Sequence, residues 1–142
     1  MIRQATSADA EAVRSLFREY ADGLGVDLSF QDFDSELADP FALYELVLIC
    51  PDGCVALRKL DDVTCEMKRL YIRPEARGGG IGRALAEAVI AHARARDYDR
   101  MLLDTLPTMT EARSLYVSLG FHEIDEYRHN PVPGTQFLEL DL

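Results

Sequence analysis

Cysteine and histidine are scarce in this sequence. The three cysteines, Cys50, Cys54 and Cys65, are an odd number, so they cannot form a complete set of disulfides. Neither they nor the three histidines have the spacing of zinc ligands. We therefore expect reduced thiols and no metal ion.

Long apolar segments and an excess of positive charge are also missing. The longest aliphatic run is "LVLIC" at 46–50, and the first twenty residues lack the hydrophobic stretch of a signal peptide. The formal net charge of -10 would repel nucleic acids and anionic membranes. These absences predict a cytoplasmic protein with neither a nucleic-acid nor a membrane partner.

Strand and helix patterns fill the chain. Its 142 residues, 48% of them hydrophobic, are enough for the core of one domain spanning 1–142. Helical spacing of apolar residues predicts helices at about 7–24, 80–96 and 109–119, with short helical turns within 26–43. Strand patterns occupy 1–6, 44–50, 54–60, 63–72, 100–106, 121–127 and 135–142. We expect an α/β fold with a mixed, mostly antiparallel sheet of about six or seven strands and about four helices, in which 64–106 form a parallel strand-helix-strand unit.

Local signals bound the last of these helices. Thr108-Met109-Thr110-Glu111 has the form of a capping box, in which the threonine hydroxyl and the glutamate each satisfy an orphan backbone amide. Gly120 stands where a left-handed residue commonly ends a helix. The sequence thus predicts a helix from just after Thr108 to Leu119.

Three consecutive glycines join a strand pattern to a helix pattern in "RLYIRPEARGGGIGRAL", residues 69–85. A glycine run entering a helix exposes several amides that have no partner, and the helix dipole adds partial positive charge there. This arrangement suits an anion, and a pyrophosphate better than a carboxylate. One acid, Glu75, accompanies the basic residues of this segment, which are Lys68, Arg69, Arg73, Arg77 and Arg83. The alternative is a glycine-rich helix start that packs closely on a strand, with solvated arginines.

The spacing of the glycines selects among phosphate-binding motifs. Arg83 and Ala84 follow Gly82, so the lysine and hydroxyl residue of a P-loop are missing, and the dinucleotide pattern G-x-G-x-x-G also fails. The pattern R-x-x-G-x-G fits Arg77 to Gly82. With "EMKRLYIRPEA" before it and "ARSLYVSLGF" after it, the sequence resembles the GNAT superfamily of acyl-CoA-dependent N-acetyltransferases over nearly its whole length.

The resemblance implies acetyl-CoA as co-substrate. In the family the fourth and fifth strands splay apart, and the pantetheine arm lies in the gap between them. By this likeness the pantetheine would contact the backbone of Leu70, Tyr71 and Ile72. The pyrophosphate would lie against Arg77, Gly78, Gly79, Gly80, Ile81, Gly82 and Arg83.

The resemblance also implies two catalytic residues. Tyr116 occupies the position from which many members point a phenol at the CoA sulfur, and its alternative role is that of a core residue at helical spacing. Glu66 matches a glutamate that serves some members as general base, and its alternative is an outward-facing residue paired with Lys68. Asp104 and water are other candidates for the base. Many members carry an asparagine where this chain has "PTMTEA", so no CoA contact is expected from Thr108 or Met109.

Acidic residues accumulate where the family places a wall of the acceptor pocket. No basic residue lies between Arg18 and Arg58, while carboxylates recur at 19, 22, 27, 32, 34, 36, 39, 45 and 52. A solvated loop is the interpretation we favour, and attraction of a cationic amine is the alternative. The "HNPVPG" segment, with Tyr127 and Phe137 beside it, is the other expected wall.

The expected function is transfer of an acetyl group from acetyl-CoA to a primary amine, on a small molecule or on a protein, by direct attack in a ternary complex. The alternatives are an acetyl-CoA-binding sensor without catalysis and an interaction protein that retains the fold. Dimers are common among the resembling enzymes, which leaves a homodimer open, although no segment of this sequence marks an interface.

Overall fold

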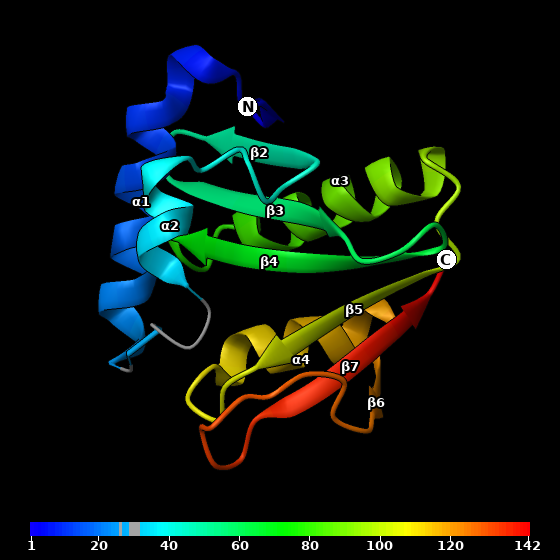
Figure 1. Ribbon diagram of the computed structural model, residues 1–142. Coiled ribbons are helices and arrows are strands. Elements are labelled where there is room, and N and C mark those ends of the chain that lie inside the picture. The colour runs from blue at the N-terminus through cyan, green and yellow to red at the C-terminus, as the bar shows by residue number, and fades with distance from the viewer. Residues whose placement is uncertain (26, 29–31) are drawn as a thin grey trace.

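A single seven-stranded sheet forms the centre of the structure, a computed structural model that describes residues 1–25, 27–28 and 32–142 (Figure 1). The strand order is β1-β2-β3-β4-β5-β7-β6, and every neighbouring pair is antiparallel except β4 and β5. The strands are β1 (Arg3–Gln4), β2 (Leu46–Cys50), β3 (Gly53–Lys59), β4 (Thr64–Ile72), β5 (Arg100–Thr105), β6 (His122–Ile124) and β7 (Gln136–Asp141). The predicted mixed sheet is confirmed.

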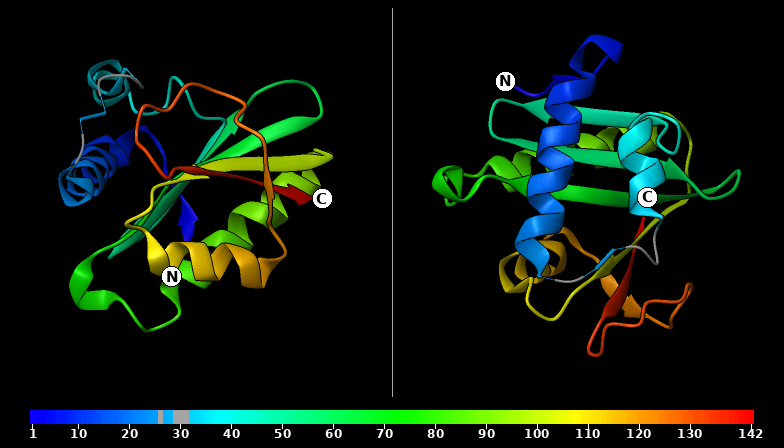
Figure 2. Two further views of the ribbon diagram at one scale, coloured as in Figure 1. Left: turned by 90° about the horizontal axis from the view of Figure 1, so that it is seen from below. Right: turned by 60° about the vertical axis from the view of Figure 1, so that its left-hand side comes forward.

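Four α-helices cover the sheet, two on each face (Figure 2). They are α1 (Ala10–Leu24), α2 (Phe33–Ala38), α3 (Ile81–Ala95) and α4 (Thr110–Leu119). Short 3-10 turns, η1 (Ser7–Asp9) and η3 (Pro74–Ala76), precede α1 and the glycine run. One buried cluster joins the sheet to α3 and α4, and a second joins its other face to α1 and α2. None of the helices in the described part of the chain is long and apolar enough to span a membrane.

The central parallel strands separate soon after they pair. Thr64–Glu66 of β4 pair with Arg100–Leu102 of β5, and beyond these residues the strands diverge (Figure 1). β4 continues to Ile72 without a strand partner on this side among the described residues. Its backbone N–H and C=O groups therefore face a gap, where a ligand can bond to them.

A β-bulge interrupts β4 beside this gap. The register with β3 slips by one residue between the pairs Ala56–Lys68 and Cys54–Tyr71, so β4 holds one residue more than β3 there. Arg69 lies in the bulge with a φ of 60°. Side chains normally alternate between the faces of a strand, but the extra residue lets Lys68 and Arg69 line the same cavity.

The end of α4 agrees with the sequence prediction, and its start does not. Gly120 has a φ of 101° and ends the helix as expected. The capping-box prediction was wrong, because Met109 is the N-cap and the described chain shows no side-chain hydrogen bond capping this helix. The reason is a turn in which the Met109 N–H donates to the Leu106 carbonyl at 3.0 Å, so that the helix begins at Thr110. All three cysteines are free thiols, as predicted.

Candidate active site

A cavity of about 530 Å³ lies where β4 and β5 separate, and we call it the strand-gap cavity. Its walls are the end of β4, the glycine run, the last turn of α1 and the start of α4. The lining residues that matter here are Leu70, Tyr71, Ile72, Arg77, Gly78, Gly80, Ile81 and Gly82. The cavity has a volume typical of small-molecule sites, and it brings together most of the residues expected to bind the cofactor.

The glycine run leaves open space in front of the α3 amides. Gly78 and Gly80 have φ angles of 86° and 85°, a conformation that glycine adopts without strain. A Cβ atom built on either residue would have no heavy atom within 4 Å. Gly80 is the N-cap of α3, so the amides that follow it have no partner within the helix and point outward. This geometry fits an anion such as a pyrophosphate.

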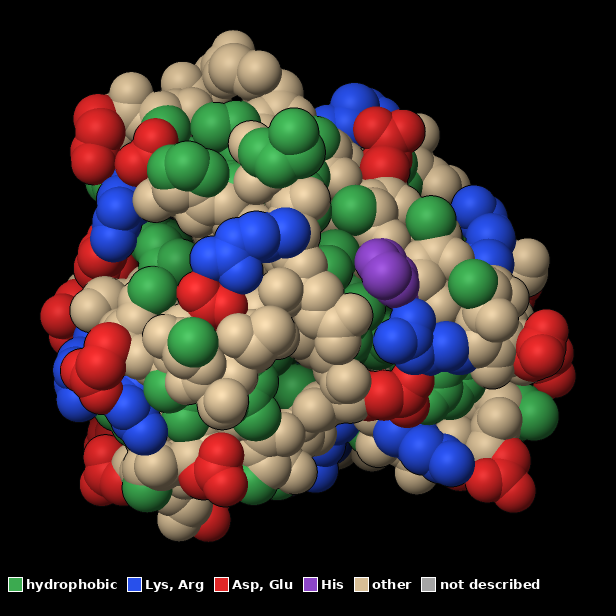
Figure 3. All heavy atoms as spheres, turned by 90° about the horizontal axis from the view of Figure 1, so that it is seen from above, with side chains coloured by type: hydrophobic (Ala, Val, Ile, Leu, Met, Phe, Trp, Pro, Cys, Tyr) green, Lys and Arg blue, Asp and Glu red, His purple; other side chains and the backbone are tan. Residues whose placement is uncertain are grey.

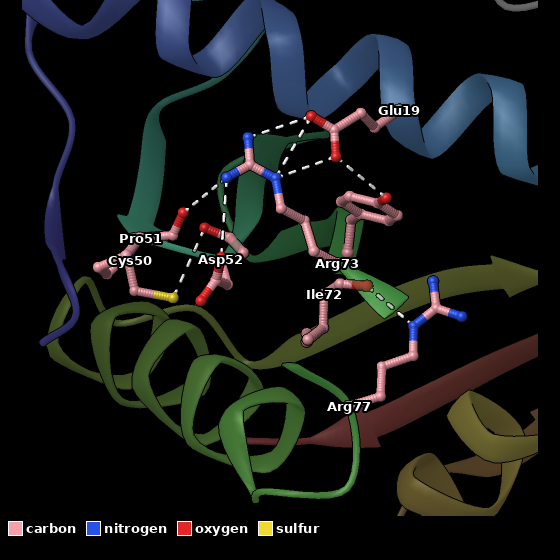
Figure 4. A network of polar contacts seen from close by, with 9 residues as sticks. Glu19, Cys50, Pro51, Asp52, Ile72, Arg73 and Arg77 are labelled. Atoms are coloured by element: carbon pink, nitrogen blue, oxygen red, sulfur yellow. Dashed lines mark hydrogen bonds and ion pairs between the residues drawn. The ribbon is translucent and has the colours of Figure 1, made fainter. Parts of the chain in front are cut away.

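Only part of the predicted basic cluster lies at the glycine run. Arg77 donates from Nε to the Ile72 carbonyl at 2.9 Å, and Arg83 donates to the Ser118 hydroxyl at 2.6 Å. Arg73 turns toward α1 and the β2–β3 turn instead, where its Nε lies 3.0 Å from Glu19 (Figure 4).

Arg69 also points away from the glycines. The bulge turns its side chain toward α2, where its Nε atom lies 2.7 Å from Oε2 of Glu36. The net charge of the 68–83 segment is therefore a weaker argument for the anion site than the sequence suggested. Arg77 and Arg83 are the basic residues that flank the glycines.

Tyr116 lies in the core between α4 and the sheet, 5% exposed. Its ring packs edge-on against Phe121, with centroids 5.6 Å apart. Burial, followed by the neighbouring Tyr20 and Asp104, raises the pKa of the Tyr116 hydroxyl well above its usual value. The phenol therefore stays protonated at neutral pH, and the only proton-transfer role left to it is that of a donor.

Glu66 is fully buried at the last residue of β4 that pairs with β5. Its Oε2 atom accepts a hydrogen bond from the Tyr127 hydroxyl at 2.6 Å and lies 2.5 Å from Nη2 of Arg128. Its Oε1 atom lies 3.9 Å from Nη1 of Arg58 and has no hydrogen-bond partner among the described residues. The expected alternative, a solvent-facing residue paired with Lys68, is not what the structure contains.

Asp104 lies on β5 across the gap from this part of β4. Its carboxylate accepts a hydrogen bond from Nδ2 of Asn130 at 3.1 Å, and it contributes to the raised pKa of Tyr116. Asn130 belongs to the "HNPVPG" segment, and Tyr127 stacks edge-on against Phe137 with centroids 5.5 Å apart. The predicted second wall thus contacts both candidate carboxylates.

A further cavity of about 560 Å³ adjoins β4 on its α2 side, and we call it the Lys68 cavity. Its lining residues are Asp32, Glu36, Leu43, Tyr44, Arg58, Leu60, Lys68, Arg69, Tyr127, Arg128 and His129. Arg128 and Arg58 were not among the site residues predicted from the sequence. The only signal for Arg128 was an arginine beside a tyrosine in "EYRHN", which looks the same as a solvated loop.

Four of the nine acidic residues predicted to form a solvated loop are instead in ion pairs with other described residues, namely Glu19, Glu36, Glu45 and Asp52. Glu36 is 1% exposed and bonded to Arg69, Glu19 is bonded to Arg73, and Glu45 lies 2.8 Å from Arg96. Acidic and basic side chains also lie side by side on the face at the β1–β2 edge (Figure 3). These four carboxylates are therefore engaged by basic side chains, whereas Asp22, Asp34 and Asp39 are exposed, as predicted for a solvated loop.

Comparison with known proteins places the chain among acetyltransferases. The sequence profile of the Acetyltransferase (GNAT) family matches residues 10–121. The chain is 38% identical to an uncharacterized N-acetyltransferase of Schizosaccharomyces pombe, over 94% of this chain and 89% of that protein. It is 36% identical to the N-acetylaspartate synthetase of Danio rerio, over 58% of this chain and 29% of that protein.

Solved structures show the same fold. The crystal structure of an acetyltransferase from Streptococcus agalactiae has a TM-score of 0.80 at 21% identity, covering 100% of this chain and 98% of that one. A GNAT family acetyltransferase from Elizabethkingia anophelis with acetyl-CoA bound has a TM-score of 0.67 at 19% identity, covering 100% and 97%. The profile match runs from the start of α1 to the end of α4 and includes both the strand gap and the glycine run. The chain therefore belongs to the GNAT family of acetyltransferases.

Proposed function

We propose that this protein transfers an acetyl group from acetyl-CoA to a primary amine, and that residues 1–142 act as a single domain in doing so. The observation that carries the proposal is the Arg77–Gly82 motif at the start of α3, open to solvent above Gly78 and Gly80 and contiguous with the strand-gap cavity. The acetyl-CoA found in the related fold from E. anophelis supports it.

The proposed cofactor contacts follow from the backbone. The amides of Gly78 to Arg83 would bind the pyrophosphate, with Arg77 and Arg83 supplying positive charge beside it. The free edge of β4 at Leu70, Tyr71 and Ile72 would bond to the pantetheine amides. The Ile72 carbonyl already accepts a hydrogen bond from Arg77, so the other backbone groups of this edge carry most of that role.

The proposed chemistry needs a proton acceptor and a proton donor. The amine nitrogen forms a bond to the thioester carbonyl carbon as the carbon–sulfur bond breaks, the amine loses a proton, and the departing thiolate gains one. We assign the acceptor role to Glu66, whose Oε1 atom is not engaged by a described hydrogen-bond donor. Asp104 and water are the alternative acceptors. We assign the donor role to Tyr116, because its raised pKa keeps it protonated.

A small-molecule acceptor is favoured over a protein. The name of the Danio rerio relative says that it makes N-acetylaspartate, an acetylated small molecule. The Lys68 cavity also has the volume of a small-molecule site.

A non-catalytic acetyl-CoA sensor is the second candidate. Two observations favour it: Tyr116 packs in the core, and the Oε2 atom of Glu66 is already bonded to Tyr127 and Arg128. The sensor predicts acetyl-CoA binding without turnover for any amine.

Thermal unfolding with acetyl-CoA, CoA and NADH tests the proposal. A ligand at about a hundred times its dissociation constant adds about 2.7 kcal/mol to the free energy of unfolding, which moves the midpoint by several degrees for a domain of this size. We expect a shift with acetyl-CoA and CoA but not with NADH, followed by thiol release when amines are added. No shift at saturating acetyl-CoA would overturn the cofactor site and the proposed activity together.

A further inference from the structure

The Lys68 cavity shares β4 with the strand-gap cavity. Lys68 and Arg69 line the first, and the next residues of the strand, Leu70 to Ile72, line the second. Since a strand rises about 3.3 Å per residue, groups bound in the two cavities can approach within a few ångströms along β4. The Lys68 cavity therefore lies where a second substrate would meet a group bound in the strand gap.

Cationic side chains dominate the lining of this cavity, in contrast to the chain as a whole. Four lining residues are cationic, Arg58, Lys68, Arg69 and Arg128, and two are carboxylates, Asp32 and Glu36. Arg69 and Glu36 neutralise one another through bonds of 2.7 and 2.8 Å. Arg58, Lys68 and Arg128 then stand against Asp32 of the lining and the buried Glu66 beside it, so a small positive excess remains inside a protein whose formal net charge is -10.

Two of these cations are arranged around Glu66, and each has N–H donors that no described residue engages. Arg58 lies directly opposite Glu66 across the β3–β4 pair, with its nearest nitrogen at 3.9 Å. Arg128 reaches Glu66 through Nη2, and no described residue accepts a hydrogen bond from its Nε atom. A single carboxylate thus lies between two guanidinium groups, and each guanidinium has several N–H donors.

Lys68 adds a third positive group, 7% exposed on the same strand. Burial, followed by the positive charge of Arg69, lowers the pKa of its ammonium to about 8. An anion bound in this cavity would offset the desolvation of the ammonium and favour its charged form.

We propose that the Lys68 cavity is the acceptor site and that the acceptor is an amino acid or a similar small amine bearing a carboxylate close to the amino group. The inference rests on the proposed acetyltransferase activity and names the substrate class of that activity. The acceptor's carboxylate bonds to Arg58, Arg128 and Lys68, and its ammonium lies toward Glu66 at the start of the strand gap. This assignment differs from the cationic amine that was the alternative interpretation of the acidic 19–52 segment.

The test compares acceptors that differ only in the carboxylate. Thiol release from acetyl-CoA is measured with L-alanine, L-aspartate and L-glutamate, with their α-amides, and with spermidine as a cationic amine. An α-amide has the more easily deprotonated amine, so amine reactivity alone favours the amides. We expect kcat/KM for the carboxylates to exceed that for the matched amides by roughly 10-fold or more, the effect of a charge-assisted hydrogen bond.

An arginine variant and a matched control locate the effect. Arg58→Gln should raise the KM for the carboxylate acceptors by roughly 10-fold without changing the KM for acetyl-CoA. Arg94→Gln removes the same charge from an exposed position on α3 and should change neither constant. Arg58 is suited to this test because its side chain is 35% exposed, and because the buried Glu66 keeps Arg128 and Tyr127 as partners when Arg58 is lost.

Different outcomes separate this inference from the activity on which it rests. Equal or faster reaction of the amides or of spermidine would overturn the carboxylate site and leave the acetyltransferase intact. If acetyl-CoA raises the unfolding midpoint but no amine reacts, the CoA complex is titrated with L-aspartate and its α-amide. The site is then supported by a further rise with L-aspartate alone, and it is overturned if L-aspartate gives no rise.

Discussion

Tyr116 is a buried phenol at the centre of the proposed chemistry. Burial and the nearby Tyr20 and Asp104 raise the pKa of its hydroxyl. The same burial makes it part of the α3–α4 core, where it packs on Phe121. At the scale of a single residue, packing and proton donation are therefore separable only by removing the hydroxyl and keeping the ring.

Tyr116→Phe performs that separation. We expect turnover to fall by roughly 100-fold, the usual contribution of a general acid, while the Kd for acetyl-CoA changes by less than about 2-fold. Tyr98→Phe is the matched control, since Tyr98 is also buried but donates to Glu45, away from the strand gap. Steady-state kinetics and calorimetric binding give the two quantities, and unchanged turnover in Tyr116→Phe would leave this tyrosine a core residue only.

The carboxylate of Glu66 is held in place by partners from distant parts of the chain, which limits the variants that can test it. Tyr127 and Arg128 bond to Oε2, and Arg58 approaches Oε1. Removing Arg128 would leave a buried carboxylate without its nearest ion-pair partner, which is why the more distant and partly exposed Arg58 is the better variant for testing the acceptor site.

At the scale of elements, the start of α3 combines an unstrained glycine turn with unpaired amides. Gly80 has a φ of 85° and open space around its Cα. Asparagine and aspartate tolerate this left-handed conformation better than other non-glycine residues, and they have nearly the same shape. The two substitutions at this position therefore differ mainly in charge.

Gly80→Asp should weaken acetyl-CoA binding by at least about 100-fold, because like charges about 4 Å apart near a surface repel by several kcal/mol. Gly80→Asn should weaken it much less. Without ligand the aspartate variant should be at least as stable as the asparagine variant, since a negative charge is favourable at a helix N-terminus. Calorimetry and thermal unfolding measure these effects, and equal affinities for the two variants would place the phosphates elsewhere.

The bulge in β4 and the short helix α2 depend on each other. Arg69 has a positive φ in the bulge, and its guanidinium bonds twice to Glu36 of α2. Both side chains are almost fully buried. The ion pair thus connects α2 to the centre of the sheet.

Glu36→Ala should lower the free energy of unfolding by about 3–5 kcal/mol, because it leaves a buried guanidinium without its carboxylate. Asp34→Ala, at an exposed position of the same helix, should change it by less than about 0.5 kcal/mol. Urea unfolding of both variants makes the comparison. A loss below about 1 kcal/mol in Glu36→Ala would mean that the pair adds little to stability.

At the scale of the whole molecule, the stability should depend on pH through Lys68. Its pKa in the folded protein is about 8, against 10.5 for the free side chain, chiefly because of burial. Below pH 8 the ammonium is charged in both the folded and the unfolded protein, so the cost of burying this charge lowers the free energy of unfolding in full. Between pH 8 and 10.5 the folded protein releases the proton first, so this residue adds roughly 3 kcal/mol of stability over that range.

The expected result is a difference in slope between the native protein and Lys68→Met. Buried tyrosines and thiols such as Cys65 have raised pKa values, so they lower the free energy of unfolding as the pH rises. Both proteins share this effect, so the difference between their stability curves isolates the contribution of Lys68. Lys59→Met, at an exposed position, is the control and should follow the native curve. Parallel curves for native protein and Lys68→Met would contradict the lowered pKa.

The sequence by itself determined the elements, their order and the phosphate motif. Periodicity of apolar residues is a local property, so it predicted most of the strands and the three long helices, and the equally local preference for glycine after a helix predicted the end of α4 at Gly120. Spacing within Arg77–Gly82 is local too, and it pointed to the family before any geometry was known. The start of α4 was predicted wrongly, because a turn at Leu106 delays the helix beyond the apparent cap.

Only the tertiary structure decided which charges act together. Five basic residues are near the glycines in sequence, but the bulge and the alternation of strand faces direct Arg69 and Arg73 to Glu36 and Glu19 instead. Conversely, Arg58, Glu66 and Arg128 come from three segments and meet only when β3, β4 and the 125–135 loop are packed together. Charge pairing depends on distances between side chains in space, and a linear pattern contains those distances only for residues close along the chain.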